Sequence, residues 1–147
     1  MCIKENNNNL KTLLIIDNEK HFLNSLKLNL GDDFEIEVAE TTEDAFLILK
    51  DCNPSAIILD WRTPKLGGRE FCQKLRSDTH FDFIPILVLS AYDTTVNRPI
   101  SYQVGADDFL SKPVTISEIR HKIELLVNDQ QFSKNLEAKI ARRKKSK

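Results

Sequence analysis

Three short runs of apolar residues, each followed by a polar side chain, constrain the fold of this chain most strongly. They occupy residues 13–16, 56–59 and 84–89. Runs of this length are short for a buried helix and are typical of strands that are covered on both faces. Segments with apolar residues at helical spacing separate them, so the sequence predicts a parallel sheet with helices packed on both sides.

Two weaker strands complete this alternation. Residues 34–38 alternate between apolar and acidic side chains, which is the period of a half-exposed strand. Phe109 and Leu110 are expected to form a brief last strand. The predicted order is therefore strand followed by helix, five times over, which defines a single α/β domain.

Two of the predicted helices carry clear boundary signals. Thr115 and Glu118 have the spacing of a capping box, so the last helix is expected to begin directly after Thr115. Pro99 has no N–H group and is tolerated best in the first turn of a helix. The fourth helix is therefore predicted to begin near Asn97 and to be short.

The two ends of the chain differ in composition from the body between them. Residues 1–11 are polar, with four consecutive asparagines, and are predicted to form a disordered leader before a domain at residues 12–128. In residues 129–147, Phe132, Leu136 and Ile140 recur every four residues, which predicts a helical extension. Either this helix is solvated, or it pairs with a partner or with a second copy of the chain as a homodimer.

The extension also carries a strong positive charge. Six of its last nine residues are basic, and removing these six from the 21 basic residues of the chain leaves 15 against 22 acidic ones. The basic cluster could contact nucleic acid or an acidic surface, but without interleaved aromatic residues it is weak evidence for either. An extension of this length cannot hold a DNA-binding domain, so we do not expect direct activity as a transcription factor or a nucleic-acid partner. The chain also lacks the apolar core of a signal peptide and any run of about 18 apolar residues, so we expect a cytoplasmic protein without a membrane span.

Polar side chains follow four of the predicted strands, at the point where each strand ends. They are Asp17, Asn18 and Glu19 after the first strand, Asp60 after the third, Ser90 after the fourth and Lys112 after the fifth. Because the carboxyl ends of parallel strands share one edge of a sheet, we expect these side chains to lie together. Carboxylate oxygens suit Mg²⁺, while an ammonium and a hydroxyl suit phosphoryl oxygens. An aspartate beside a metal is a plausible nucleophile, so the sequence predicts a site for one phosphoryl group.

Four motifs, in order along the chain, carry a resemblance to a known family. They are Leu14-Ile15-Ile16-Asp17; Ile57-Ile58-Leu59-Asp60-Trp61-Arg62-Thr63-Pro64 with Gly67-Gly68; Val88-Leu89-Ser90-Ala91; and Gly105-Ala106-Asp107-Asp108-Phe109-Leu110-Ser111-Lys112-Pro113. Over roughly residues 11–128 the chain resembles the receiver domain of two-component response regulators, of the stand-alone type. The resemblance implies a flavodoxin-like fold with five parallel strands in the order 2-1-3-4-5.

The resemblance also implies a role for each matching residue. Asp60 would be the phosphoacceptor; Asp17, Asp60 and the backbone carbonyl of Arg62 would bind Mg²⁺; Ser90 would be the hydroxyl switch residue; Phe109 would swing inward on phosphorylation; and Lys112, before a cis proline, would contact the phosphate. The implied partners are a histidine kinase or phosphotransfer protein and a downstream protein. Self-phosphorylation and autodephosphorylation would be the only reactions, so no other enzymatic activity is expected.

One departure from the family pattern concerns the metal site. Family members usually carry two adjacent acids after the first strand, and the second is a direct metal ligand. Asn18 stands there in this chain, and its amide oxygen carries no charge, so weaker Mg²⁺ binding is expected. Glu19 could substitute for it, but its side chain is expected to point elsewhere. Trp61 and Arg62 are expected to be exposed at the edge of the site.

Two alternative functions compete with that of a phosphoacceptor. The first is a pseudo-receiver, which has the same fold but binds its partner without phosphorylation, and Asn18 is its best support. The second is an aspartyl-phosphate phosphatase of the haloacid dehalogenase type. Those enzymes place a second aspartate two residues after the nucleophile, whereas this chain has Arg62 there, which counts against the phosphatase.

Overall fold

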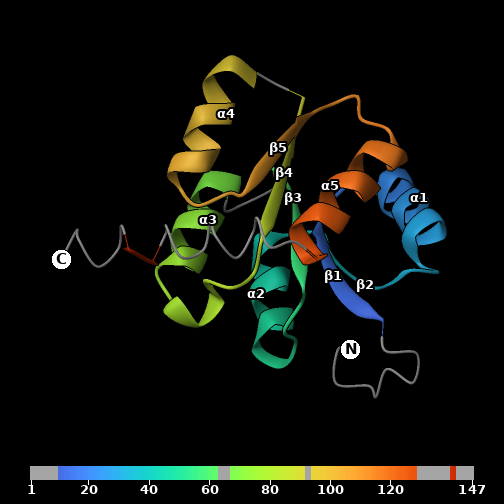
Figure 1. The fold of residues 1–147 in the computed structure, drawn as a ribbon, viewed down its shortest axis with the longest axis horizontal. Helices are drawn as coiled ribbons and strands as arrows, with labels where there is room; N and C mark the ends of the chain where they lie inside the picture. Colours follow the sequence, from blue (N-terminus) through green and yellow to red (C-terminus); the bar gives the residue numbers. More distant parts are fainter. Residues whose placement is uncertain (1–9, 63–66, 92–93, 129–139, 142–147) are drawn as a thin grey trace.

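A computed structural model describes residues 10–62, 67–91, 94–128 and 140–141. Its centre is a parallel sheet of five strands in the order β2-β1-β3-β4-β5, with helices on both faces (Figure 1). The strands are β1 (Lys11–Ile16), β2 (Phe34–Ala39), β3 (Ala56–Asp60), β4 (Ile86–Ser90) and β5 (Asp108–Ser111). The predicted α/β fold and its strand order are confirmed.

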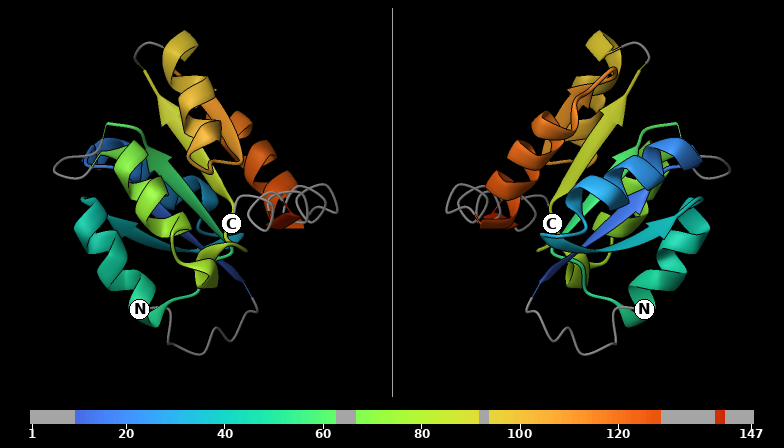
Figure 2. Two further views of the ribbon diagram at one scale, coloured as in Figure 1. Left: turned by 90° about the vertical axis from the view of Figure 1, so that its left-hand side faces the viewer. Right: turned by 90° about the vertical axis from the view of Figure 1, so that its right-hand side faces the viewer.

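The helices connect these strands as right-handed crossovers require. They are α1 (Lys20–Leu30), α2 (Thr42–Asp51), α3 (Gly68–Arg76), α4 (Thr94–Gln103) and α5 (Ile116–Asn128), with a short 3₁₀ helix, η1 (Thr79–Phe81), before β4. Helices α1 and α5 cover one face of the sheet, and α2, α3 and α4 cover the other, as the side views of Figure 2 show.

Alternate residues of the central strands feed two separate cores, one on each face of the sheet. On the side of α1 and α5, Ile15 and Ile58 pack among leucines and isoleucines of those helices. On the side of α2 and α3, Leu14 and Ile57 pack against aromatic and aliphatic side chains. Burial on both faces explains why these strands appear in the sequence as unbroken apolar runs.

Helix α4 begins earlier than the sequence predicts. It starts at Thr94 rather than near Asn97, so Pro99 lies inside the helix. A proline there removes one backbone hydrogen bond. Pro99 is exposed, so its ring lies on the solvent side of the helix. The adjacent Ser101 hydroxyl donates a hydrogen bond to the Arg98 carbonyl at 2.7 Å.

The predicted capping box at the start of α5 is confirmed. The Glu118 backbone N–H donates to the Thr115 hydroxyl at 3.1 Å, and the Thr115 N–H donates to a Glu118 carboxylate oxygen at 3.4 Å. These two bonds satisfy donors that a helix N-terminus otherwise leaves without partners.

A buried arginine ties α3 to the amino ends of β4 and β5, a contact that no pattern in the sequence predicts. Arg76 donates to the carbonyls of Gly105, Phe81 and Ile84 at 3.1, 2.7 and 2.8 Å. It also forms an ion pair with Asp107 at 3.1 Å. The Asp107 carboxylate in turn accepts a hydrogen bond from the Ile86 N–H. We call Arg76, Asp107 and these partners the Arg76 cluster; it lies at the edge of the sheet opposite the carboxyl ends of the strands.

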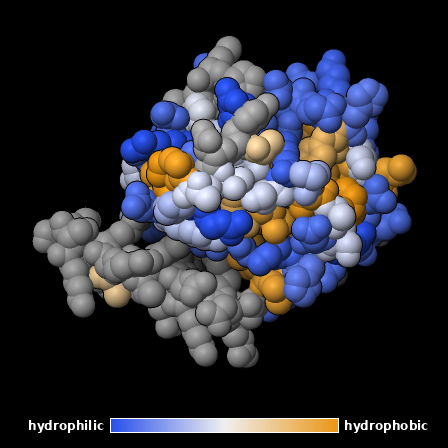
Figure 3. Space-filling model, turned by 90° about the horizontal axis from the view of Figure 1, so that it is seen from above, coloured by the Kyte–Doolittle hydropathy of each residue, from blue (hydrophilic) through white to orange (hydrophobic). Residues whose placement is uncertain are grey.

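The surface and the chain ends complete the description. Large apolar side chains are exposed at scattered positions, namely Leu28, Leu47, Phe83, Val96, Tyr102 and Leu125, and one face shows apolar areas separated by polar ones (Figure 3). Among the described residues, no helix is long and apolar enough to cross a membrane. Only residues 10–11 of the predicted leader lie within the described residues. Of the predicted C-terminal extension, only residues 140–141 are described, and they are helical.

Candidate functional site

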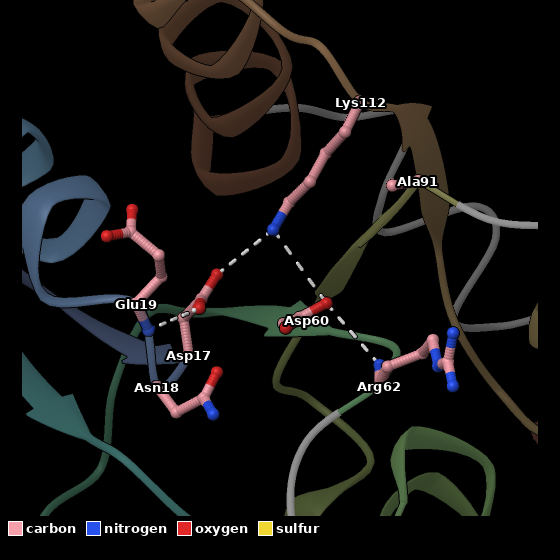
Figure 4. A pocket seen from close by; sticks show the side chains of 7 residues that line it. All are labelled: Asp17, Asn18, Glu19, Asp60, Arg62, Ala91 and Lys112. Atoms are coloured by element: carbon pink, nitrogen blue, oxygen red, sulfur yellow. Dashed lines mark hydrogen bonds and ion pairs between the residues drawn. The ribbon is translucent and has the colours of Figure 1, made fainter.

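An open hollow of about 460 Å³ lies at the carboxyl ends of the strands. It is lined by Asp17, Asn18, Glu19, Asp60, Arg62, Ala91 and Lys112. These residues lie at or just after the carboxyl ends of four strands, β1, β3, β4 and β5 (Figure 4). Most of the residues that the sequence singles out therefore meet in one place, although Asp17 and Lys112 are 95 positions apart.

Asp60 ends β3 and presents its carboxylate to the hollow. One of its oxygens, Oδ1, accepts the Arg62 backbone N–H at 3.4 Å and lies 3.8 Å from the Lys112 ammonium. Burial raises the pKa of Asp60 above its usual value, and the charge of Asp17 adds to this, while Lys112 opposes it. No hydrogen bond to the other oxygen, Oδ2, is present among the described residues, which leaves that oxygen available to a ligand.

Asp17 and Lys112 form an ion pair that lines the hollow beside Asp60. The Lys112 ammonium lies 3.2 Å from Asp17 Oδ2, and the Glu19 backbone N–H donates to Asp17 Oδ1 at 2.9 Å. The Lys112 backbone N–H donates a hydrogen bond to the Ser90 carbonyl at 2.8 Å. The Lys112 ammonium lies over the Phe22 ring. The predicted cis bond before Pro113 is present. The lysine therefore stands between two carboxylates.

Asn18 and Glu19 differ in what they offer to the hollow. Asn18 is exposed and lines it with a neutral amide. Both carboxylate oxygens of Glu19 accept backbone N–H groups of α1, from His21 at 3.0 Å and from Phe22 at 2.7 Å. Glu19 is thus the N-cap of α1, and its position immediately before a helix is the sequence signal for that role. This use of both oxygens speaks against Glu19 as a substitute metal ligand.

Ser90 and Phe109 do not line the hollow. Ser90 ends β4 with only 1% of its surface exposed, and Ala91, the next residue, lines the hollow instead. Phe109 is also 1% exposed, in the core between the sheet and α4, with the Arg98 guanidinium 4.7 Å from its ring centre. The Phe109 ring, which is expected to swing inward on phosphorylation, is thus buried in the core in this structure.

The prediction that Trp61 is exposed is wrong. Only 8% of Trp61 is exposed, and it packs into the core on the α2 and α3 side. The Gly68 N–H donates to the Trp61 carbonyl at 3.0 Å, which brings the start of α3 against the indole. A Cβ on Gly68 would lie 2.8 Å from that ring, so only glycine fits there. Arg62, in contrast, is exposed as predicted.

Comparisons with known proteins agree with this geometry. The family model described as the response regulator receiver domain matches residues 13–124. The chain belongs to this family. Over 133 residues it is 33% identical to response regulator Rre1 of Synechocystis sp., covering 89% of this chain and 58% of that protein. This receiver domain chain thus spans little more than half the length of that curated relative.

Solved structures of receiver domains have the same fold. The receiver domain of the Francisella response regulator 1452 is 27% identical, with a TM-score of 0.74 over 80% of this chain and 97% of that one. The receiver domain of sensor histidine kinase PA1611 from Pseudomonas aeruginosa, with magnesium coordinated in its active-site cleft, is 20% identical. Its TM-score is 0.72 over 82% of this chain and 99% of that one, a likeness of fold alone.

Proposed function

We propose that this receiver domain is a cytoplasmic phosphoacceptor that receives a phosphoryl group on Asp60 from a partner histidine kinase or phosphotransfer protein. The observation that carries the proposal is the position of Lys112, which lies between Asp17 and Asp60 in an open hollow. An ammonium there can pair with a phosphoryl oxygen on Asp60 while it stays bound to Asp17. Signalling to a downstream protein then follows from contacts that exist only with the phosphoryl group present.

The transfer needs few protein groups. An Asp60 oxygen attacks the phosphorus of the donor phosphohistidine; the new O–P bond forms as the N–P bond breaks, and the imidazole nitrogen keeps the electron pair. Oδ2 is the oxygen suited to this attack, since Oδ1 faces Arg62 N–H and Lys112. Lys112 orients the phosphoryl group during the transfer. Hydrolysis of the acyl phosphate by water later restores Asp60.

The oxygen ligands at the hollow fit a hard divalent cation, although they carry less negative charge than the ligands of such a cation usually do. Asp17, Asp60, the Asn18 amide oxygen and the Arg62 backbone carbonyl would hold Mg²⁺, since all four are oxygen ligands at one end of the sheet. When bound, the ion offsets the repulsion between carboxylates and phosphoryl oxygens. Only two of these ligands are charged, and no group of three acidic, histidine or cysteine side chains suited to a metal occurs among the described residues.

Acetyl phosphate tests the proposal without knowledge of the partner kinase. We expect incubation with acetyl phosphate and MgCl₂ to add one phosphoryl mass to the intact chain, and Asp60→Asn to remove that product. Asp51→Asn is a matched control, because Asp51 is an exposed carboxylate at the end of α2, far from the hollow. A chain that gains no mass, or gains it equally in Asp60→Asn, would contradict the proposal.

A pseudo-receiver is the second candidate, and one observation favours it. Asn18 removes a charge from the metal ligands. In that case the surface formed by α4, β5 and α5 would bind a protein partner constitutively. The acetyl phosphate experiment separates the two, since a pseudo-receiver stays unmodified even at high Mg²⁺.

A further inference from the structure

The Lys112 ammonium has a third neighbour besides the two carboxylates of the hollow. It lies over the ring of Phe22, 4.9 Å from the ring centre, while Asp17 Oδ2 and Asp60 Oδ1 lie 3.2 and 3.8 Å from it. An ammonium within about 6 Å of the centre of an aromatic ring is attracted by the negative potential of the ring face. Phe22 is not among the residues that line the hollow, so its ring supports Lys112 and leaves the hollow itself open.

Backbone hydrogen bonds and packing fix the position of Phe22. Its N–H donates to Glu19 Oε2 at 2.7 Å, and the Glu19 N–H donates in turn to Asp17 Oδ1 at 2.9 Å. The Phe22 side chain is partly buried and packs against the core on the α1 and α5 side. A short chain of bonds therefore runs from Asp17 through the cap of α1 to Phe22, and both ends of this chain contact Lys112.

A lysine at this site needs support of this kind. Its side chain is long and flexible, and that of Lys112 is 24% exposed. The ammonium lies closer to Asp17 than to Asp60, so attraction to Asp17 alone would draw it away from the proposed acceptor. A ring face attracts the ammonium but carries no net charge, so the full positive charge of Lys112 remains available to a phosphoryl oxygen.

We propose that Phe22 is a positioning residue for phosphoryl transfer, whose ring holds the Lys112 ammonium where it can pair with a phosphoryl oxygen on Asp60. The inference rests on the proposed function, since it requires Asp60 to be the acceptor. With acetyl phosphate as donor, the O–P bond to Asp60 forms as the bond from phosphorus to the acetyl oxygen breaks, and acetate leaves with the electron pair. Phe22 takes no part in this exchange and acts only through the position of Lys112.

Two substitutions at Phe22 separate the effect of the ring from that of apolar packing. Phe22→Leu keeps an apolar side chain but removes the ring, whereas Phe22→Tyr keeps the ring. Phe46→Leu is a matched control, because Phe46 is also partly buried, in the core on the other face of the sheet, and the Lys74 ammonium lies 4.9 Å from its ring centre. The control removes the same kind of contact without changing a neighbour of Lys112.

The rate of phosphorylation by acetyl phosphate in MgCl₂, followed by intact mass, gives the first readout. We expect Phe22→Leu to react about two- to fivefold more slowly than the wild type, the rate equivalent of one contact between a cation and a ring near the surface. Phe22→Tyr should restore the wild-type rate, and Phe46→Leu should match it. A role in apolar packing alone predicts the reverse order at Phe22, because leucine is more apolar than tyrosine.

The NMR signals of the lysine side chains give a second readout that does not depend on phosphorylation. Protons above the face of an aromatic ring are shifted upfield by its ring current. We expect the ε-methylene protons of Lys112, assigned by their loss in Lys112→Met, to be shifted upfield in the wild type and in Phe22→Tyr. In Phe22→Leu they should return toward the usual lysine position. Phe46→Leu should leave them in place and move the signals of Lys74 instead.

The outcomes separate this inference from the proposed function. Modification of Asp60 at equal rates in Phe22→Leu and in the wild type would overturn the inference and leave the phosphoacceptor proposal standing. A Lys112 signal that is unchanged in Phe22→Leu, or a rate lowered equally in Phe22→Tyr or in Phe46→Leu, would also overturn it. No modification of the wild type would overturn both proposals. A slower reaction in Phe22→Leu, with the rate and the Lys112 signal restored in Phe22→Tyr, supports the inference.

Discussion

The two edges of the sheet each pair a basic side chain with buried or half-buried aspartates, but in different ways. In the Arg76 cluster the guanidinium makes at least four hydrogen bonds with described residues, and its partner Asp107 has 1% of its side chain exposed. At the hollow, Lys112 is 24% exposed and reaches Asp17 and Asp60 at 3.2 and 3.8 Å. One edge is closed and fully bonded, and the other is open.

This difference separates a structural ion pair from a ligand site. A buried pair contributes to the fold only where additional hydrogen bonds satisfy the remaining donors and acceptors, as they do around Arg76. The oxygens and ammonium at the hollow are held at longer distances and leave Asp60 Oδ2 without a hydrogen bond among the described residues. Charged groups that are gathered but not fully bonded to each other can exchange their contacts for those of a phosphoryl group.

Substitution of Arg76 should have the largest effect on stability. Arg76→Met removes the guanidinium and leaves the Asp107 carboxylate buried without its charge partner. We expect a loss of about 3–5 kcal/mol in the free energy of unfolding, the usual cost of breaking one side of a buried pair. Urea unfolding followed by circular dichroism measures it. A loss below about 1 kcal/mol would place Arg76 among surface pairs and remove the contrast between the two edges.

A substitution at Gly105 tests the same cluster from its other side. Gly105 has a φ of +108°, and a Cβ there would lie 2.6 Å from Arg76 Cγ. Gly105→Ala should lower the free energy of unfolding by about 1–2 kcal/mol, since alanine rarely adopts this backbone conformation. The same urea experiment measures it, and Gly105→Ala combined with Arg76→Met should cost less than the sum of the two.

Lys112 is the counterpart of Arg76 at the open edge. Lys112→Met should lower the free energy of unfolding by less than Arg76→Met does, by about 1–2 kcal/mol, because the ammonium is partly exposed although it leaves the buried Asp17 carboxylate without its charge partner. Burial is the main reason that the pKa of Asp60 is raised, and Lys112 opposes it, so this substitution should raise that pKa further. Carboxyl chemical shifts of Asp60 across a pH titration test the direction, and a lowered pKa would contradict this electrostatic account.

Asp60 itself should show the smallest effect, and with the opposite sign. Its raised pKa means that the folded protein keeps the Asp60 proton to higher pH than the unfolded chain does. Wild-type stability therefore falls as the pH rises from 3.8 through the raised value. Asp60→Asn cannot ionise, so it should be slightly more stable than the wild type at neutral pH. The gain should vanish on acidification below 3.8, and urea midpoints at both pH values measure it.

The sequence predicted the open edge better than the closed one. Asp17, Asp60 and Lys112 each follow a strand that its apolar residues identify, and parallel strands bring such positions together. The Arg76 cluster depends on partners up to 31 positions away, in η1 and in the loops before β4 and β5, and no local pattern encodes that contact. Burial of Trp61 likewise follows from the close approach of α3 at Gly68.

Two local expectations were wrong or incomplete because tertiary packing decides them. Pro99 suggested a helix start near Asn97, yet α4 begins at Thr94 and accommodates the proline on its exposed side. Glu19 was expected to point away from the metal site, but only the structure shows that both of its oxygens cap α1. In each case the residue type was informative, but its hydrogen-bond partners could be assigned only from the structure.

Identification of the modified residue tests the central claim most directly. The chain is incubated with acetyl phosphate and MgCl₂, the acyl phosphate is reduced with borohydride to homoserine, and the peptides are sequenced by mass spectrometry. We expect homoserine at position 60 and at no other aspartate. Homoserine at Asp17 or elsewhere, or none at any position, would contradict the assignment of Asp60 as the phosphoacceptor.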